Sequence, residues 1–171
     1  DQGLGVQQDN HKAREWYEKA AVQGNPIAQM NLGTLYNQGR GVQQDYLKAC
    51  ELYEKAAAQG FAKAQTSLGS MYIQGKGVRQ DYQKAREWYE KAAAQGDVLA
   101  QTNLGIMYEQ GRGVQQDYHK AREWYKKAAA QGNPLAQMNL GVMYEQGLGV
   151  QQEYRKAREW YEKAAVQGEV L

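Results

Sequence analysis

Apolar residues recur along the chain at helical spacing, in segments separated by glycine-rich turns. Between residues 26 and 38 they fall on one helical face: Ala28, Leu32, Leu35 and Tyr36. Between residues 46 and 59 they form a second face: Tyr46, Ala49, Leu52, Tyr53, Ala56 and Ala57. Asn25 and Asp45 stand where an N-cap is needed, and Pro26 suits a first helical position. The two segments predict a helical hairpin, whose members we call helix A and helix B.

The hairpin pattern returns every 36 residues. A closing Gln-Gly dipeptide places its glycine at the same point of each copy: Gly24, Gly60, Gly96, Gly132 and Gly168. The chain divides into a partial repeat (1–24), four full repeats (25–60, 61–96, 97–132 and 133–168) and the start of another (169–171). One hairpin cannot bury its own apolar face, so neighbouring hairpins must stack. The sequence therefore predicts an all-α solenoid of 36-residue helix-turn-helix repeats, a single array over residues 1–171.

Glycines inside the repeat indicate close packing and tight turns. Gly33 lies within helix A, where a glycine costs about 1 kcal/mol in helix propensity. It recurs in the later repeats as Gly69, Gly105 and Gly141. This recurrence predicts a neighbouring helix that approaches too closely for a Cβ atom. Gly39 and Gly41 follow helix A and suit the positive φ of a Schellman-type stop and a tight turn.

The first repeat departs from the pattern because it lacks a helix A. Gly3 and Gly5 align with Gly39 and Gly41, so we expect a loop before its helix B. Asn10 stands where the later repeats carry a tyrosine, and neither end of the array has the polar face of a capping repeat. We therefore expect a frayed first helix, end-to-end self-association, and a chain that is a fragment of a longer array.

Charge and composition exclude several classes of partner. The net charge is only +2, which gives no large field for nucleic acid or an anionic membrane surface. No apolar run approaches the ~20 residues of a membrane-spanning helix, so no membrane insertion is expected. The tryptophans and tyrosines of helix B share a face with its alanines, which favours packing over the stacking of nucleic-acid bases.

The sequence offers no constellation for catalysis or metal binding. His11 and His119 occupy equivalent positions three repeats apart without other ligands at metal-binding spacing, so we predict no metal and no cofactor. Cys50 stands where other repeats carry an arginine, beside Leu52 in place of a tryptophan. We interpret this change as a local repacking and not as a catalytic thiol. No carboxylate is placed for acid–base work, and we predict that the protein is not an enzyme.

The repeat has a specific consensus: Ala28-x3-Leu32-Gly33-x2-Tyr36-x2-Gly39-x-Gly41-Val42-x2-Asp45-Tyr46-x-Lys48-Ala49-x3-Tyr53-x-Lys55-Ala56-Ala57-x-Gln59-Gly60. It closely resembles the Sel1-like repeat, a relative of the tetratricopeptide repeat, over essentially the whole chain. The resemblance implies a right-handed α/α superhelix and a scaffold or adaptor role in protein complexes. It also implies a bacterial protein and favours a periplasmic or secreted one. Some cysteine-rich bacterial members carry a disulfide in each repeat and are linked to β-lactam binding, but this chain lacks those cysteine pairs.

Positions that vary between repeats are candidates for recognition, because stacking does not dictate them. In helix A they form one stripe away from the core face. The stripe reads Ile27, Met30, Thr34 and Asn37; Lys63, Thr66, Ser70 and Ile73; Leu99, Thr102, Ile106 and Glu109; and Leu135, Met138, Val142 and Glu145. Beside it runs an amide ladder: Asn31, Asn103 and Asn139, with Ser67 in the remaining copy.

In tetratricopeptide relatives the matching face of helix A lines a concave groove, and the resemblance implies the same here. The expected partner-binding residues are Met30, Asn31, Thr34, Thr66, Ser70, Thr102, Asn103, Ile106, Glu109, Met138, Asn139, Val142 and Glu145. The ladder would bind the backbone of an extended segment while the stripe contacts its side chains. The alternative is that the amides form hydrogen bonds within the stack. The stripe would then be a solvated face whose residues vary without a binding role.

Three functions remain open at this stage. The leading one is a scaffold that binds a protein or peptide in the groove. The second is a binder of small molecules or cell-wall fragments with weak, β-lactamase-like hydrolase activity, which a convergent pocket with a perturbed acid or nucleophile would favour. The third is a purely structural spacer.

Overall fold

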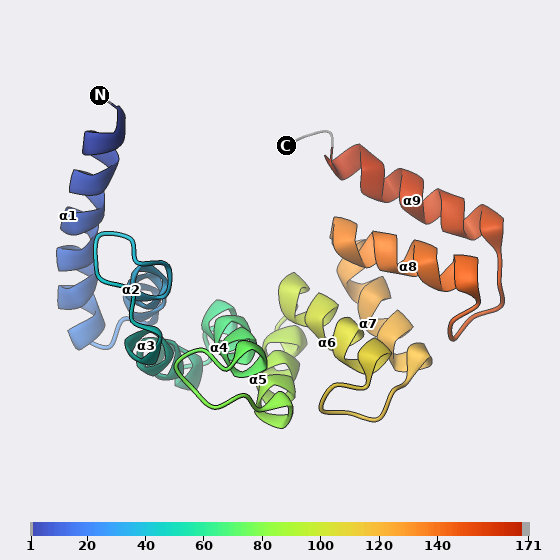
Figure 1. Cartoon of the computed structure of the whole chain (residues 1–171), viewed down its shortest axis with the longest axis horizontal. Coiled ribbons are helices and arrows are strands. Elements are labelled where there is room, and N and C mark those ends of the chain that lie inside the picture. The colour runs from blue at the N-terminus through green and yellow to red at the C-terminus, as the bar shows by residue number, and fades with distance from the viewer. Residues whose placement is uncertain (1, 169–171) are drawn as a thin grey trace. The chain divides into compact units, whose positions relative to one another are not determined.

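The computed structural model describes the backbone of residues 2–168 and the side chains of residues 12–166. Over residues 2–168 the chain forms nine helices and no strand, which confirms the all-α prediction (Figure 1). In chain order these are α1 (Gln2–Val22), α2 (Pro26–Gln38), α3 (Tyr46–Ala58), α4 (Ala62–Gln74), α5 (Tyr82–Ala94), α6 (Val98–Gln110), α7 (Tyr118–Ala130), α8 (Pro134–Gln146) and α9 (Tyr154–Gly168). Helix A of the full repeats is α2, α4, α6 or α8, and helix B is α3, α5, α7 or α9.

The start of the chain differs from expectation. Helix α1 begins at Gln2, so the residues that align with the Gly39–Val42 turn are helical and the predicted loop was wrong. In the full repeats this turn is held by its own helix A and by the preceding hairpin. Among the described residues, the main packing partner of α1 is α2, which follows it, so these contacts do not hold its first turns in the loop geometry. The fraying expected of this helix stays a prediction.

Local sequence signals set the helix ends. The side-chain oxygens of Asn25 and Asp45 each accept a backbone N–H bond at 3.0 Å from the first turn of the following helix, which confirms both N-caps. Helix α2 ends at Gly39, whose φ is 67°. The Arg40 N–H then donates to the Leu35 carbonyl at 3.1 Å, the six-to-one bond of a Schellman motif.

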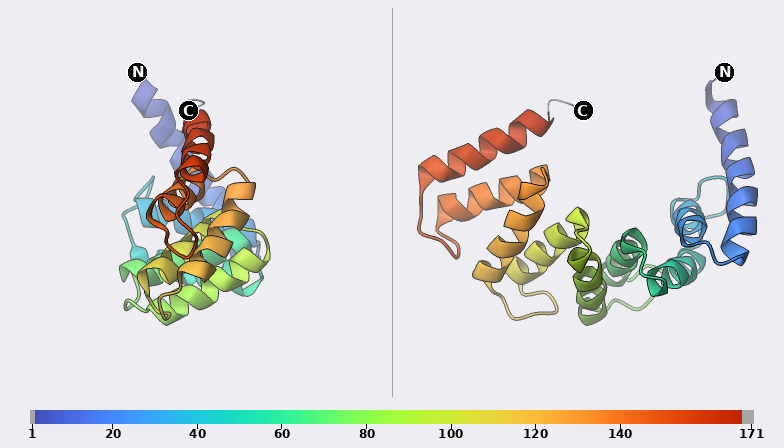
Figure 2. Two further views of the ribbon diagram at one scale, coloured as in Figure 1. Left: turned by 90° about the vertical axis from the view of Figure 1, so that its right-hand side faces the viewer. Right: turned by 180° about the vertical axis from the view of Figure 1, so that it is seen from behind.

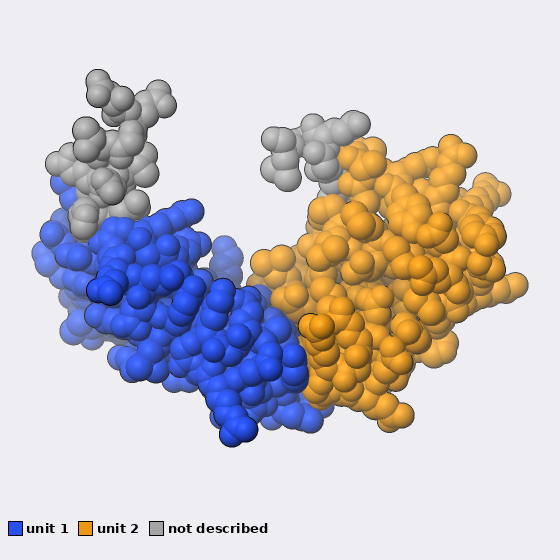
Figure 3. Space-filling model, viewed as in Figure 1, with its two compact units in different colours: residues 1–91 blue, residues 92–171 orange. Residues whose placement is uncertain are grey.

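The chain comprises two compact units, residues 1–91 and 92–171, and the boundary falls inside α5 (Figure 3). In unit 1, α2 packs against both α1 and α3, and α3 packs against α4. In unit 2, α7 packs against both α6 and α8, and α8 packs along α9, as the views of Figure 2 also show. Within each unit, consecutive helices are thus the main packing partners, as expected of stacked hairpins.

A tyrosine of helix B explains the glycine inside helix A. A Cβ atom on Gly33 would lie 2.8 Å from Tyr53 Cε1, and one on Gly69 would lie 2.6 Å from Tyr89 Cε1. Both rings are buried. Gly105 and Gly141 meet the rings of the corresponding tyrosines of α7 and α9 even more closely. The predicted close approach is confirmed, and the group that approaches is a tyrosine ring.

A buried glutamine ties successive hairpins together. In unit 2, Gln101 Nε2 donates to the Ala93 carbonyl at 3.4 Å, and Gln101 Oε1 accepts from Gln131 Nε2 at 2.9 Å. Gln29 does the same in unit 1, with bonds of 3.2 and 2.9 Å. A buried amide is tolerated when both its oxygen and its nitrogen are bonded. Gln29 and Gln101 therefore each link the helix before their own to the residue that ends the helix after it, whereas at Gln137 only the amide nitrogen is bonded. Sequence reasoning missed this role.

Candidate functional site

In unit 1 the helix A stripe is only partly accessible. Met30, Asn31, Thr34 and Ser70 are half-buried, and Met30 packs against the hydrophobic core. Thr66, an expected groove residue, is buried with 6% of its surface exposed. It therefore offers little surface to a partner, and its role in binding stays a prediction.

In unit 2 the stripe divides into an exposed and a covered part. Leu99, Leu135 and Met138 are 61, 46 and 50% exposed. Thr102, by contrast, is 2% exposed, and its hydroxyl donates to the Val98 carbonyl at 2.8 Å. A buried threonine is tolerated here because a carbonyl of its own helix accepts the hydrogen bond from its hydroxyl. Thr102 therefore offers even less surface to a partner than Thr66, and its role in binding also stays a prediction. The other expected members in this unit are half-buried or exposed: Asn103, Ile106, Glu109, Asn139, Val142 and Glu145.

In unit 1 the small hydroxyl residues of the stripe serve the buried tyrosines. Thr34 Oγ1 lies 3.3 Å from the Tyr53 hydroxyl, and Ser70 Oγ lies 3.0 Å from the Tyr89 hydroxyl. Thr34 and Ser70 each already donate their own proton to a backbone carbonyl of their helix. The tyrosine hydroxyl must therefore be the donor in both pairs.

In unit 2 an acidic residue replaces that acceptor. Ile106 and Val142 occupy the positions of Thr34 and Ser70 and offer no acceptor. Glu109 accepts the bond from the Tyr125 hydroxyl instead, and Glu145 accepts from the Tyr161 hydroxyl at 2.8 Å. The variation between repeats at these two stripe positions is therefore compensated internally. It reflects two ways to bond the same tyrosine hydroxyl, whose ring is buried at Tyr53, Tyr89 and Tyr125 and half-buried at Tyr161, and it is not by itself evidence of recognition.

The same network reaches the amide ladder. Burial, reinforced by the Glu109 carboxylate, raises the pKa of the Tyr125 hydroxyl, while a hydrogen bond from Asn139 opposes that shift. Glu109, Tyr125 and Asn139 belong to α6, α7 and α8, so one polar network crosses three helices. At Asn139 this favours the alternative in which the amides bond within the stack. Asn31 and Asn103 are half-buried and remain candidates for contact with a partner.

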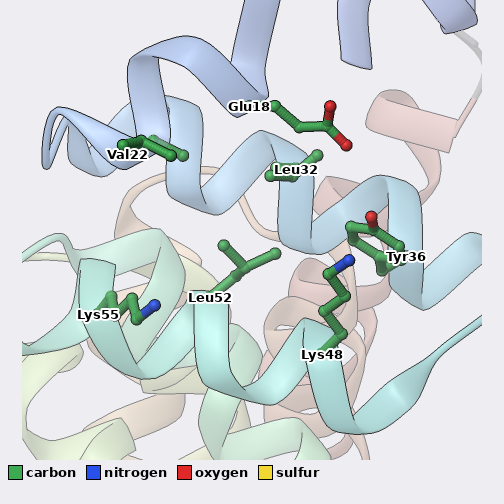
Figure 4. A pocket seen from close by; sticks show the side chains of 8 residues that line it. Glu18, Val22, Leu32, Tyr36, Lys48, Leu52 and Lys55 are labelled. Carbon is green, nitrogen blue, oxygen red and sulfur yellow. The ribbon is translucent and has the colours of Figure 1, made fainter. Parts of the chain in front are cut away.

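A second feature was missed by sequence reasoning. A cavity of about 360 Å³ with almost entirely apolar walls lies between α1, α2 and α3 in unit 1 (Figure 4). Leu52 points from α3 toward Leu32 of α2, and Val22 of α1 lies above one end. Lys48 and Lys55 extend from α3 to the edge. The available signal was the leucine at position 52, where the other copies carry Trp16, Trp88, Trp124 and Trp160.

The remaining candidates for chemistry are separate side chains. His119 is exposed, whereas His11 lies outside the described side chains. Cys50 is 2% exposed, and its thiol donates to the Lys76 carbonyl at 3.3 Å, which agrees with a packing role. Among the described residues, no three His, Cys, Asp or Glu side chains come together as a metal site requires. None of the helices in the described part of the chain combines the length and apolar character needed to cross a bilayer.

Comparison with known proteins identifies the repeat. The Sel1 repeat profile matches residues 1–25, 26–61, 62–97, 98–133 and 134–169. No protein with a curated description matches the chain. Among solved structures, the chain is similar to c5321, a protective antigen present in uropathogenic Escherichia coli strains that displays an SLR fold. The identity is 43% and the TM-score 0.88, over 92% of this chain and 34% of that one.

Two further structures are similar. A Sel1 repeat protein from Oxalobacter formigenes shares 37% identity with a TM-score of 0.87, over 97% of this chain and 68% of its own. The cysteine-rich protein B of Helicobacter pylori shares 27% identity with a TM-score of 0.60, over 77% of this chain and 94% of its own. This chain thus spans about a third of the length of the Escherichia coli protein. Proteins built from such repeats generally act as protein-interaction scaffolds and are typically not enzymes.

The profile covers nearly every residue, the helix pairs follow its period, and two structures more than 30% identical share the fold. The chain belongs to the Sel1 repeat family.

Proposed function

We propose that the protein is an interaction scaffold whose helix A surface binds a segment of a protein partner. One observation carries the proposal: a row of exposed, large apolar side chains in unit 2, formed by Leu99, Leu135 and Met138. Exposed apolar side chains gathered on one surface are typical of interaction sites. Leu99 and Leu135 occupy the same position in the first turns of α6 and α8, the two helices A of this unit.

In unit 2 this row is the part of the stripe that internal contacts leave unexplained, and Ile27, at the equivalent position of unit 1, is likewise 56% exposed. The tyrosine hydroxyl bonds account for the positions of Ile106, Val142, Glu109 and Glu145. They do not account for a leucine or methionine that is about half exposed. Full burial of such a side chain contributes ~1.5–3 kcal/mol, so three half-buried ones could add roughly 2–4 kcal/mol to an interface. Methionine also adapts its shape to different partners.

The test is a pull-down and crosslinking experiment with the intact chain. A photo-crosslinker placed at Gln146, an exposed position of α8 that none of the substitutions below changes, should capture a protein partner. The triple substitution of Leu99, Leu135 and Met138 by serine should abolish capture, because it removes the apolar row without touching the core. Leu47→Ser is the matched control, since Leu47 is 60% exposed but belongs to helix B. Capture that survives the triple substitution, or fails equally in the control, would exclude this surface.

The amide ladder is tested separately. Asn31→Ala combined with Asn103→Ala, at the two amides that remain candidates, should weaken the binding of an established partner if the amides bind its backbone. An unchanged affinity for the partner would show that the amides do not take part in binding, and it would leave the apolar row as the binding surface. No specific observation favours the small-molecule hydrolase or the structural spacer as a second candidate.

End-to-end association remains a prediction. Trp16 on α1 and Val166 on α9 are 68 and 65% exposed, and such apolar side chains favour stacking of one copy on another. Light scattering over a concentration series should show a rising average mass. A constant monomer mass at the highest concentration would contradict it.

A further inference from the structure

The cavity between α1, α2 and α3 lies where the other repeats place an indole. Leu32 and Leu52, which line it, correspond 36 positions later to Leu68 and Trp88. Trp88 is half-buried against the core of unit 1, and Trp160 packs in the same way against the core of unit 2. The cavity is therefore the space that a tryptophan side chain fills in the sister repeats, left open by the smaller leucine.

In each sister repeat a lysine lies over the indole. Lys91 Nζ is 4.2 Å from the ring centroid of Trp88, and Lys163 Nζ is 4.2 Å from that of Trp160. These are cation–π distances, and the arrangement stabilises a ring at that place. Lys55 holds the equivalent position at the edge of the cavity, next to Leu52. One partner of the cation–π pair is thus present, and a leucine stands in place of the other.

The size and charge of the cavity narrow the choice of occupant. Its volume of about 360 Å³ lies within the range of sites that bind organic groups. Leu32 and Tyr36 are 4 and 8% exposed, so the wall they form is preformed. Lys48 and Lys55 line the edge with one carboxylate, Glu18. Arg14 pairs with Glu18 at 3.6 Å and Asp45 acts on Lys48, so three positive groups stand against two negative ones. This excess of positive charge favours an occupant with acidic groups around its apolar part.

We propose that the cavity binds an aromatic side chain, tryptophan above all, of a protein partner whose flanking residues are acidic. The ring packs against Leu32 and Leu52 beneath Lys55 Nζ, as the indole of Trp88 lies beneath Lys91. Acidic flanking residues pair with Lys48 and Lys55. None of the cavity residues belongs to the helix A stripe, so this site is separate from the apolar row of unit 2 and does not depend on it.

The direct test uses capped tripeptides and methyl NMR of the full chain. Glu-Trp-Glu should shift the methyl signals of Val22, Leu32 and Leu52 in a saturable way. Lys-Trp-Lys should bind at least fivefold more weakly, and Glu-Ala-Glu should cause no shift. The absence of shifts with Glu-Trp-Glu would overturn the proposal. So would binding of free indole-3-acetate without binding of the tripeptide, because the cavity would then be a small-molecule site.

Variants of the chain provide matched controls. Leu52→Trp fills the cavity and should weaken Glu-Trp-Glu at least tenfold, whereas Leu47→Trp, on an exposed position of the same helix, should bind like the parent. Trp88→Leu should create a second site of the same kind. Circular dichroism will show whether Leu52→Trp folds. If it does not, Lys55→Glu is the alternative variant, because Lys55 lies at the edge of the cavity. It should remove the preference for peptides with acidic flanking residues. Parent-like binding by a folded Leu52→Trp, or an unchanged preference in Lys55→Glu, would overturn the proposal.

Discussion

The packing of a tyrosine ring on a glycine makes Gly69→Ala a sensitive test of the repeat. In an unconstrained helix this substitution stabilises by about 1 kcal/mol, because alanine has the higher helix propensity. In α4 the new Cβ would lie 2.6 Å from Tyr89 Cε1 and 2.8 Å from Tyr89 Cδ1. Distances below 3 Å between carbon atoms are repulsive, so either the ring or the helix must move.

The ring has little freedom to move. Tyr89 is 2% exposed, and its hydroxyl is bonded to Ser70 at 3.0 Å. Overpacking of a buried site costs ~1–3 kcal/mol, and from this the helical gain is subtracted. Because the ring can hardly relax, we take the upper part of this range, ~2–3 kcal/mol, and subtract the gain of ~1 kcal/mol. We therefore expect Gly69→Ala to destabilise by roughly 1–2 kcal/mol, which corresponds to a fall in Tm of about 2–8 °C for a chain of this length. Gly33→Ala should cost less, because its nearest ring carbon is 2.8 Å away.

Urea denaturation followed by circular dichroism measures the effect, and hydrogen exchange should place it in α4 and α5. In a Tyr89→Leu background, where the clash is absent, Gly69→Ala should become stabilising, so the double-mutant cycle should show coupling. Lys63→Ala, at an exposed position of the same helix, is the control. If Gly69→Ala is as stable as the parent, or if Gly33→Ala costs more, the packing argument is wrong.

Buried polar groups lead to three more outcomes. Burial, together with Glu109, raises the pKa of the Tyr125 hydroxyl above its usual ~10. The stability that this hydroxyl contributes is therefore complete below pH ~10 and is lost as the pH rises above that value. Tyr125→Phe should flatten the fall of Tm at alkaline pH, and an unchanged slope would contradict this. Burial raises the pKa of the Cys50 thiol to about 11, so a disulfide reagent at neutral pH should label the native chain far more slowly than the urea-unfolded chain, and equal rates would show an accessible thiol. Gln101→Leu removes the hydrogen bonds that Gln101 makes between hairpins and should lower the free energy of unfolding by ~1–3 kcal/mol in urea denaturation, unlike Gln110→Leu at the exposed end of the same helix. Equal effects would show that these bonds do not stabilise the stack.

The helices and their ends were predictable because they depend on neighbouring residues. Asn25, Asp45 and Gly39 act through bonds to atoms within five positions in the chain. The 36-residue period then repeats these signals, which is why the helix bounds agree closely with the predicted ones. The purpose of Gly33 was also readable, since a costly residue that recurs inside a helix needs a packing reason.

The candidate surface was predicted less well. Comparison of repeats shows which positions differ, but it does not show what they contact. Thr66 and Thr102 vary between repeats and are nevertheless buried. Ser70 accepts the hydrogen bond of a tyrosine 19 positions away, and Glu109 that of a tyrosine 16 positions away. Only the packing of helix A on helix B brings these residues together.

By itself the sequence determined that the chain is a series of helical hairpins of fixed length, because caps, turns and helical periodicity act over a few residues. The tertiary structure decided which faces of those helices remain exposed and which variable positions are compensated internally. It also decided that a leucine in place of a tryptophan leaves a cavity and is not absorbed by repacking. Those outcomes depend on the distances between side chains from different helices, and such distances arise only when the hairpins stack.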